Sequence, residues 1–367
     1  MIAALIKALS GSSAAALRLA ALPVSERQTR RIPALVRLTA EGKGLSITAT
    51  TFDGTITTWI EAAAEGEVAV PLEPLAALVR NFPGDAEIAI AADDRAAIIT
   101  AGSSRFMLPV FPVADLPEPL LLGVATGRVE LGAKIARDLF ARPAFAAADE
   151  VSRPYLNGIF LQSTGDNLVA VAADGFRICR ITTPATSTLS TDRSLIIPNA
   201  TVKTIDRLLA NTSGNVTLRR SERLFEIEGA GFALTTRRID AVYPDCERWI
   251  PGDGPNVATV SRGVLSESIA RFAAVAGPEI RTPVVNLRWN AGGLHLGADG
   301  SEDCLAADVI GEGETAVQIR HVADIIGALR GDNVRISVGS PGGMIVVTDP
   351  DDESFVAGLM PIRPRSS

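Results

Sequence analysis

Hydrophobic and polar residues alternate along this chain in a pattern that occurs three times. In each copy, two alternating runs are joined by a glycine-containing turn and end on an Asp-Gly pair. A two-residue alternation of this kind predicts two antiparallel strands connected as a hairpin. The three copies read LVRLTAEGKGLSITATTFDG, GIFLQSTGDNLVAVAADG and VNLRWNAGGLHLGADG.

The Asp-Gly pairs give the length of the repeat. Their aspartates are Asp53, Asp174 and Asp299, so successive copies lie 121 and 125 residues apart. Repeats of this length are whole domains rather than the short units of a solenoid. Segments rich in glycine, proline and polar residues near residues 125 and 252 then predict domains at 1–124, 125–252 and 253–367.

Each copy also contains two helical stretches, marked by apolar residues three and four positions apart. One stretch precedes the hairpin, and the other follows it and ends at a turn, NFPG, NTSG or RGDN. More alternating strands come next, and each copy closes on an apolar residue before a proline. The pattern predicts an α+β domain whose two helices cover one side of antiparallel sheets. The helical stretches lie at 10–22, 71–81, 131–142, 200–211, 261–272 and 318–330.

Composition places the chain among folded globular proteins. Its 367 residues are 47% hydrophobic and 21% charged, which suffices for two or three domains with their own cores. The formal net charge of -7 argues against a protein that coats nucleic acid with an open basic face. The six helical stretches are nonetheless net positive together. They would form a basic face if they all lie on one side; alternatively, exposed helix surfaces simply favour Lys and Arg.

Cysteine and histidine usage limits the possible chemistry. Cys179, Cys246 and Cys304 are odd in number and far apart, which fits neither a disulfide framework nor a zinc site. The only histidines, His295 and His321, do not have metal-ligand spacing. The sequence predicts no metal and no cofactor. The N-terminal apolar run lacks a preceding basic region and no run is long enough to span a membrane, so we expect a cytoplasmic protein.

Four segments resemble the signature segments of a known family. They are RPYLNGIF at 153–160, AADGFRI at 172–178, YPDCERWIP at 243–251 and LMPIRP at 359–364. They are similar in kind, order and spacing to those of the bacterial DNA polymerase III beta subunit, the beta sliding clamp family. The resemblance covers nearly the whole chain and matches the three-domain period.

The resemblance implies a ring-shaped dimer of two chains joined head to tail, with helices lining the hole and sheets forming the outer wall. Such a ring is a non-catalytic processivity factor that encircles duplex DNA without reading its sequence. Weak and diffuse contacts with phosphates suit sliding, because base-reading contacts would stall it. The implied partners are the replicative polymerase, the clamp loader and repair proteins, which present short peptides to a pocket between the second and third domains.

Residue by residue, the resemblance implies a peptide pocket lined by apolar groups with a few polar ones. The expected lining is Arg153, Leu156, Ala173, Gly175, Phe176, Arg177, Ile178, Pro244, Arg248, Trp249, His321, Met360, Pro361, Ile362 and Arg363.

The same comparison implies DNA-facing residues and a subunit interface. Each basic residue alone could equally be a solvated surface charge, and the interface strand residues could equally serve their own core. The implied DNA-facing residues are Arg27, Arg30, Arg31, Lys134, Arg137, Tyr155, Lys203 and Arg207. The implied interface places Phe106 and Leu108 against Phe272 and Val275 of the partner's third domain.

Three pocket positions depart from the family pattern. Phe176 stands where a histidine is common, Trp249 where a smaller aliphatic residue is usual, and His321 where an aromatic or other residue lies. A clamp-fold paralogue with a specialised, decoy or resistance role is therefore an alternative to a general clamp.

An enzyme that uses acidic residues such as Asp174 and Asp299 is the alternative from another class. Asp-Gly is a strong turn signal, and its repetition in every copy favours a structural role. The chain has neither a P-loop nor a nucleophile elbow. These observations make the enzyme the less favoured interpretation.

Overall fold

The structure is a computed structural model, which describes residues 4–9, 34–41, 44–150, 152–190, 192, 194–245, 247–250, 252, 254–277, 282–340 and 342–362. The predicted helix at 10–22, the predicted DNA-facing residues Arg27, Arg30 and Arg31, and the predicted pocket residue Arg363 lie outside the described residues.

The chain forms two compact units, and each sheet belongs to one of them. The first unit comprises Met1–Arg137, Ser187–Leu189 and Ala200–Arg238, and it holds a twelve-stranded sheet in the order β8-β7-β6-β1-β5-β2-β3-β4-β16-β15-β14-β9. All its pairings are antiparallel. Its strands are β1 (Ala4–Leu9), β2 (Leu35–Glu41), β3 (Gly44–Thr50), β4 (Gly54–Glu61), β5 (Ala63–Pro71), β6 (Glu87–Ala92), β7 (Ala96–Ala101), β8 (Ser104–Pro109), β9 (Gly127–Gly132), β14 (Asn215–Arg220), β15 (Leu224–Gly229) and β16 (Phe232–Arg237).

The second unit comprises Asp138–Thr186, Ser190–Asn199 and Ile239–Ser367. It contains a nine-stranded sheet, β13-β10-β11-β12-β25-β24-β23-β17-β21, and a four-stranded sheet, β20-β19-β18-β22. Their strands are β10 (Gly158–Thr164), β11 (Asn167–Ala173), β12 (Arg177–Pro184), β13 (Ile196–Pro198), β17 (Asn256–Ser261), β18 (Val284–Asn290), β19 (Gly293–Ala298), β20 (Ser301–Leu305), β21 (Ala307–Ile310), β22 (Gly313–Gln318), β23 (Asn333–Val338), β24 (Ile345–Asp349) and β25 (Asp352–Leu359).

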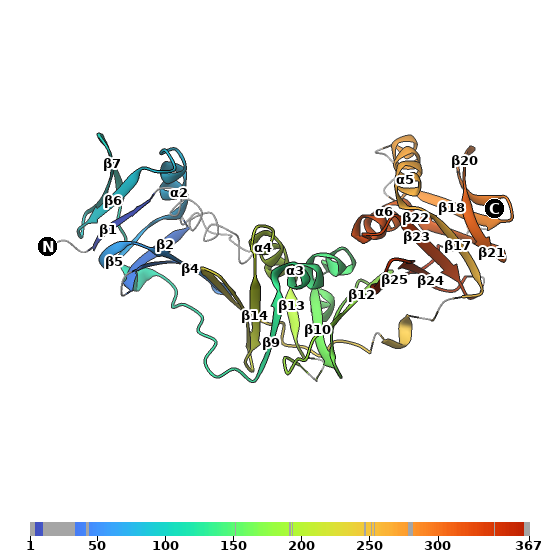
Figure 1. Cartoon of the computed structure of the whole chain (residues 1–367), viewed down its shortest axis with the longest axis horizontal. Helices are drawn as coiled ribbons and strands as arrows, with labels where there is room; N and C mark the ends of the chain where they lie inside the picture. The colour runs from blue at the N-terminus through green and yellow to red at the C-terminus, as the bar shows by residue number, and fades with distance from the viewer. Residues whose placement is uncertain are drawn as a thin grey trace. The chain divides into compact units, whose positions relative to one another are not determined.

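Five predicted helical stretches lie in the described residues, and all five form α-helices. In Figure 1, α5 and α6 lie together, and both contact strands of the third repeat. The helices are α2 (Leu72–Arg80), α3 (Ala133–Ala141), α4 (Asn199–Leu209), α5 (Arg262–Ala276) and α6 (Ile319–Ala328). Four short 3-10 turns are η1 (Val113–Asp115), η2 (Pro143–Ala146), η3 (Pro154–Leu156) and η4 (Glu247–Trp249).

Helix α2 shows how the sequence pattern determines packing. Leu72, Leu75 and Val79 are spaced three and four residues apart, so they share one face, and all three are buried. They join the core of the first repeat, against alternately buried residues such as Ile88 and Ile90 of β6. Burial of such side chains contributes about 1.5–3 kcal/mol each. The α+β prediction is thus confirmed.

Two strand pairs join consecutive repeats into continuous sheets, and Figure 1 labels β12 and β25 of the second pair. At the first junction β4 pairs with β16, and Gly54 lies opposite Thr236. At the second junction β12 pairs with β25, and Arg177 lies opposite Leu359. A sheet thus continues across each predicted domain limit.

The three Asp-Gly pairs lie in hairpin connections, between β3 and β4, β11 and β12, and β19 and β20. Their geometries differ. Asp299 and Gly300 form a two-residue connection with φ of 47° and 80°, values typical of the turns that suit hairpins. Gly175 has a φ of 93°, a region in which a side chain is strained.

Candidate functional site

The Asp174 turn, residues 174–177, closes the β11–β12 hairpin at the second junction. The Oδ1 atom of Asp174 accepts hydrogen bonds from the backbone N–H groups of Phe176 (2.8 Å) and Arg177 (2.9 Å). Asp and Asn stabilise turns in this way, by bonding to the backbone two residues on. The predicted turn role of Asp174 is therefore seen directly in its hydrogen bonds.

Arg177 links this turn to helix α6. Its Nε donates to Asp174 Oδ2 at 2.9 Å, and its Nη1 donates to Asp324 Oδ2 at 2.5 Å. The guanidinium also lies 5.4 Å from the centre of the Phe145 ring, within the range of a cation–π contact. With only 9% of its side chain exposed, Arg177 is held among these groups.

Three of the predicted pocket residues are exposed and apolar: Phe176 in the turn, Met360 after β25 and Trp249 in η4. Phe176, Trp249 and Met360 are 54%, 47% and 42% exposed, although large apolar residues are usually buried. The Phe176 ring lies 6.3 Å from the ring of His321, which α6 carries. The backbone N–H of Met360 donates to Phe176 O at 2.7 Å. We call Phe176, His321, Met360 and Trp249 the lining surface; these contacts join the first three, and Trp249 is included from the predicted pocket.

Three other predicted pocket residues are buried behind this surface. Leu156, Ala173 and Ile178 are at most 5% exposed and belong to one core cluster with Tyr243. Tyr243 stacks on Phe160 with ring centres 4.8 Å apart. These three residues therefore belong to the core rather than to the exposed surface.

Arg153 packs over the backbone of Gly175. A Cβ atom added at Gly175 would lie 2.8 Å from Arg153 Nη1, so the glycine permits the close approach. Arg153 also forms an ion pair with Glu150 at 2.8 Å, and this hydrogen bond lowers the pKa of Glu150 below its ordinary value. The requirement for glycine here comes from its positive φ, because the flexible Arg153 side chain could shift away from an added Cβ.

The remaining predicted pocket residues are more loosely placed. Arg248 forms an ion pair with Asp245, with Nε 3.2 Å from Oδ2, and 85% of the Arg248 side chain is exposed. Pro244, Pro361 and Ile362 are partly buried, and the Ile362 N–H donates to Ala316 O at 2.7 Å.

His321 has a lowered pKa. Burial is the largest cause, and the positive charges of Arg177 and Arg320 add to it, while Asp174 and Asp324 oppose the shift. The imidazole is therefore mainly neutral at neutral pH.

Sequence reasoning missed Asp324 and Phe145 as parts of this site. Asp324 lies three residues after His321 on α6, so the helical spacing carried a signal. Phe145 lies in η2, and no local pattern pointed to it.

The predicted DNA-facing residues of α3 and α4 differ in their surroundings. Lys134, Lys203 and Arg207 are exposed. Arg137 forms an ion pair with Asp206 at 2.6 Å. Its charge is therefore partly neutralised. Tyr155 is partly buried and packs against the core cluster of Leu156.

The predicted interface residues also differ. Phe106 is 44% exposed on β8, the edge strand of the twelve-stranded sheet, and its ring lies 5.9 Å from that of Phe82. Leu108 is partly buried and packs against the core of the first repeat. Val275 is 70% exposed, but Phe272 is only 6% exposed within its own domain.

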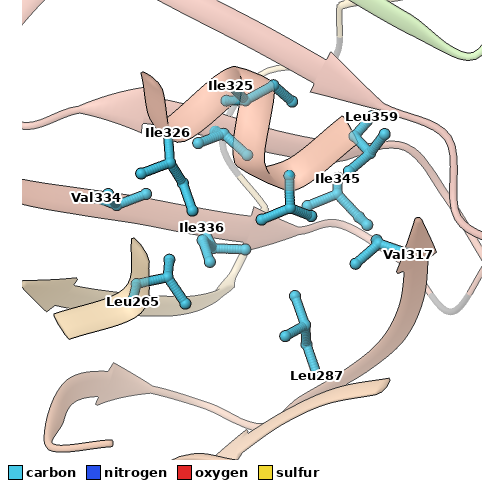
Figure 2. Close-up of a pocket in the computed structure, with 11 residues that line it drawn as sticks. Leu265, Leu287, Val317, Ile325, Ile326, Val334, Ile336, Ile345 and Leu359 are labelled. Atoms are coloured by element: carbon cyan, nitrogen blue, oxygen red, sulfur yellow. The ribbon is translucent and has the colours of Figure 1, made fainter. Parts of the chain in front are cut away.

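A small apolar cavity lies within the core of the third repeat (Figure 2). Its volume of about 10 Å³ is at the lower limit of the roughly 10–15 Å³ that one water needs, and a water also needs polar partners. Residues such as Leu265, Ile326 and Leu359 line it, so it is a packing gap rather than a binding site.

Within the described residues, no group of three His, Cys, Asp or Glu side chains could hold a metal ion. None of the helices described is long and apolar enough to span a membrane.

Comparison with known proteins gives a consistent result. Family models of the DNA polymerase III beta subunit match the chain with the N-terminal domain at residues 12–121, the central domain at 130–245 and the C-terminal domain at 247–363. The beta sliding clamp of Caulobacter vibrioides (strain NA1000 / CB15N) is 28% identical over 354 residues, which cover 93% of this chain and 94% of the relative.

Two solved structures show the same fold. The DnaN sliding clamp (DNA polymerase III subunit beta) of Pseudomonas aeruginosa bound to griselimycin matches with a TM-score of 0.90 at 25% identity, covering 98% of this chain and 100% of that chain. The Caulobacter crescentus beta sliding clamp matches with a TM-score of 0.88 at 27% identity, covering 98% and 99%.

Proposed function

This chain belongs to the DNA polymerase III beta subunit family, and from that membership we propose how its residues carry out the family's task. The chain is a DNA sliding clamp, a processivity factor without catalytic chemistry. The enzyme alternative is not favoured. DNA and a polymerase are the partners that the family implies, together with dimerisation.

The lining surface is the proposed peptide site. The observation that carries this proposal is the exposure of Phe176 and Met360, which a backbone hydrogen bond joins beside the Asp174 turn. Exposed apolar side chains on a fixed backbone suit an extended peptide with apolar anchors and a polar residue. The replicative polymerase, the clamp loader and repair proteins are the proposed peptide donors.

The proposed DNA contacts are diffuse. Lys134, Lys203 and Arg207 are exposed on two helices of the second repeat and would attract phosphates without reading bases. Arg27, Arg30 and Arg31 stay proposals from the sequence, as does Tyr155. Arg137 would contribute less because it shares its charge with Asp206.

The proposed active form is a head-to-tail homodimer in the cytoplasm, built from domains at 1–124, 125–252 and 253–367. Phe106 on the open edge of β8 and the exposed Val275 support an interface there. Leu108 and Phe272 would act from behind it, because both pack within their own domains. A head-to-tail interface that closes after two copies gives a ring and not a filament.

A clamp-fold paralogue with a decoy or resistance role is the second candidate. Phe176, Trp249 and His321 at three pocket positions favour it, because they change the shape and polarity of the peptide site. Such a paralogue would keep the ring but bind a different set of peptides.

A topological assay tests the clamp. The protein is loaded by a clamp loader onto nicked circular DNA, which is then cut. We expect retention on the circle and loss after linearisation, because a ring slides off a free end. Retention that ignores the cut would contradict the proposal.

Two variants sharpen this assay. Phe106→Asp should abolish retention on the circular DNA. The solution mass of this variant should fall from about twice 38.4 kDa, that of a dimer, to that of one chain. Phe52→Asp is the matched control, since Phe52 is 84% exposed in the same unit but lies between β3 and β4, which are not neighbours of β8 in the sheet.

A further inference from the structure

Arg177 differs from the other pocket residues that the structure describes in being both charged and enclosed. Only 9% of its side chain is exposed, and its Nε and Nη1 atoms already donate to Asp174 and Asp324. Two of its five N–H donors are thus held by carboxylates, and the low exposure of the side chain leaves little of it for a bound peptide to reach.

One end of this link determines the shape of the turn. Asp174 uses Oδ1 for the backbone N–H groups of Phe176 and Arg177, and it uses Oδ2 for the guanidinium. One carboxylate, that of Asp174, therefore holds both the turn that orients Phe176 and the side chain of Arg177. A change at the guanidinium would alter the partner that holds the turn.

The other end fixes a helix of the next repeat. Asp324 lies on α6 three residues after His321, so the Arg177–Asp324 pair holds the helix that presents the imidazole. The Phe145 ring lies against the guanidinium and limits its tilt. Lysine could replace the charge but not the planar, two-sided contact.

Phe176 lies between these two anchors. Its ring faces His321, and its carbonyl accepts the Met360 N–H at 2.7 Å. Three of the four residues of the lining surface thus depend on the relative position of the Asp174 turn and α6.

We infer that Arg177 is a positioning residue of the peptide site rather than a peptide contact. It spans the second junction and holds Phe176, His321 and Met360 in one arrangement before any peptide arrives. The inference rests on the proposed peptide function of this surface. Among the described arginines, Arg248 and Arg320 are far more accessible than Arg177, because their side chains are 85% and 83% exposed.

Three variants of the full-length chain test this role. Asp324→Asn removes one ion-pair partner and keeps its size, and Arg177→Lys keeps the charge without the fork. Asp303→Asn is the matched control, because Asp303 forms a 2.6 Å ion pair with Arg271 in the same repeat. The probe is griselimycin, with which the Pseudomonas aeruginosa clamp was crystallised.

Two measurements are made on each variant. Griselimycin affinity is followed by the fluorescence of Trp249, which is 47% exposed, with Trp249→Phe to assign the signal. Amide hydrogen exchange at Met360 reports its bond to Phe176 without any ligand.

We expect Asp324→Asn and Arg177→Lys to weaken griselimycin binding on the order of tenfold, the usual size of a coupling between linked groups. Exchange at Met360 should become faster in both, while Asp303→Asn changes neither measurement. If Asp324→Asn binds like the parent and protects Met360 equally, the inference is wrong, even if Arg177→Lys does not fold.

The parent protein separates this inference from the function on which it rests. One outcome is that griselimycin does not change the Trp249 fluorescence of the parent, while Met360 exchanges faster in Asp324→Asn than in the parent. This would count against the peptide site and support the positioning role. The opposite outcome is that the parent binds griselimycin and that the variants match it in affinity and in Met360 exchange. This would support the site and overturn the positioning role.

Discussion

The two junctions between repeats share a backbone arrangement but differ in their side chains. At the first junction the Arg237 N–H donates to Asp53 O at 2.9 Å, and at the second the Met360 N–H donates to Phe176 O at 2.7 Å. In both, an antiparallel strand pair continues the sheet beside an Asp-Gly turn.

Side chains at the first junction bond to backbone carbonyls. Arg237 Nε donates to Phe52 O at 2.9 Å, and Thr236 Oγ1 donates to Asp53 O at 3.1 Å. Side chains at the second junction form ion pairs between repeats. These pairs are Arg177–Asp324, Arg142–Asp352 and Arg330–Asp138.

This difference explains why one Asp-Gly turn accompanies a candidate site and the other does not. A bond to a carbonyl holds one side chain against the backbone of the other repeat. An arginine–carboxylate pair needs both side chains and has a defined geometry. The second junction therefore holds side chains, as well as strands, in fixed positions.

The largest expected effect is a decrease in the free energy of unfolding when Arg142 is replaced. This arginine is 8% exposed, and its Nη1 donates to Asp352 at 2.7 Å while its Nε donates to Ala328 O. Arg142→Met would leave Asp352 partly buried and unpaired, which should lower the free energy of unfolding by about 3–5 kcal/mol. Urea denaturation, followed by a probe in the second unit, measures this loss.

Arg237→Met at the first junction is the matched control. Arg237 is exposed and bonds to a neutral carbonyl, so its loss should lower the free energy of unfolding by about 1 kcal/mol or less. Equal losses for Arg142→Met and Arg237→Met would remove the distinction between the junctions.

A smaller effect is expected from Thr236→Val at the first junction. The Thr236 hydroxyl is buried and pairs with the Thr201 hydroxyl at 2.9 Å as well as with Asp53 O. Valine has a similar size but would leave the buried Thr201 hydroxyl without this partner, a loss of about 1–3 kcal/mol in the free energy of unfolding. Thermal denaturation measures it.

Thr39→Val serves as the comparison for this substitution. Thr39 donates to the Glu67 carboxylate at an exposed contact, where water can replace the bond. We expect the free energy of unfolding of the Thr39→Val variant to stay within about 0.5 kcal/mol of that of the parent. A larger loss for Thr39→Val than for Thr236→Val would show that burial is not what strengthens the first junction.

The smallest expected effect is a pH dependence confined to the second junction. Burial, and then Arg177, lower the pKa of His321 below its ordinary value of 6.5, against the opposing charges of Asp174 and Asp324. As the pH falls below about 6.5, the unfolded chain takes up a proton before the folded one does, so stability decreases.

Melting temperatures measured from about pH 7.5 to about pH 5.5 test this dependence. His321→Gln should remove part of the decrease, since glutamine does not titrate. His295→Gln is the control because the chain has only these two histidines. An equal change in both variants would count against His321 as the source.

Much of the fold could be predicted because its signals are local. The spacing of Leu72, Leu75 and Val79 gave helix α2, and the Asp-Gly pairs gave three hairpin turns. These features depend on residues a few positions apart, whose geometry the backbone fixes. The family resemblance rested on short segments and was confirmed over the three domains.

The candidate site could be predicted only as a set of residues. The sequence grouped Leu156, Arg177 and Phe176 as one lining, but the structure buries Leu156, encloses Arg177 and exposes Phe176. Phe272 likewise lies mainly within its own domain. Burial depends on the packing of distant segments, so no local pattern could have separated these residues.

The sequence by itself determined the three repeats, their helices and strands, and the family to which the chain belongs. Only the tertiary structure decided which junction holds its side chains by ion pairs. Arg177 and Asp324 are 147 residues apart in the chain, and their contact exists because β12 pairs with β25 and brings α6 beside the Asp174 turn. Sequence periodicity depends only on the position of each residue on its own helix or strand, whereas an ion pair forms only where two elements meet in space.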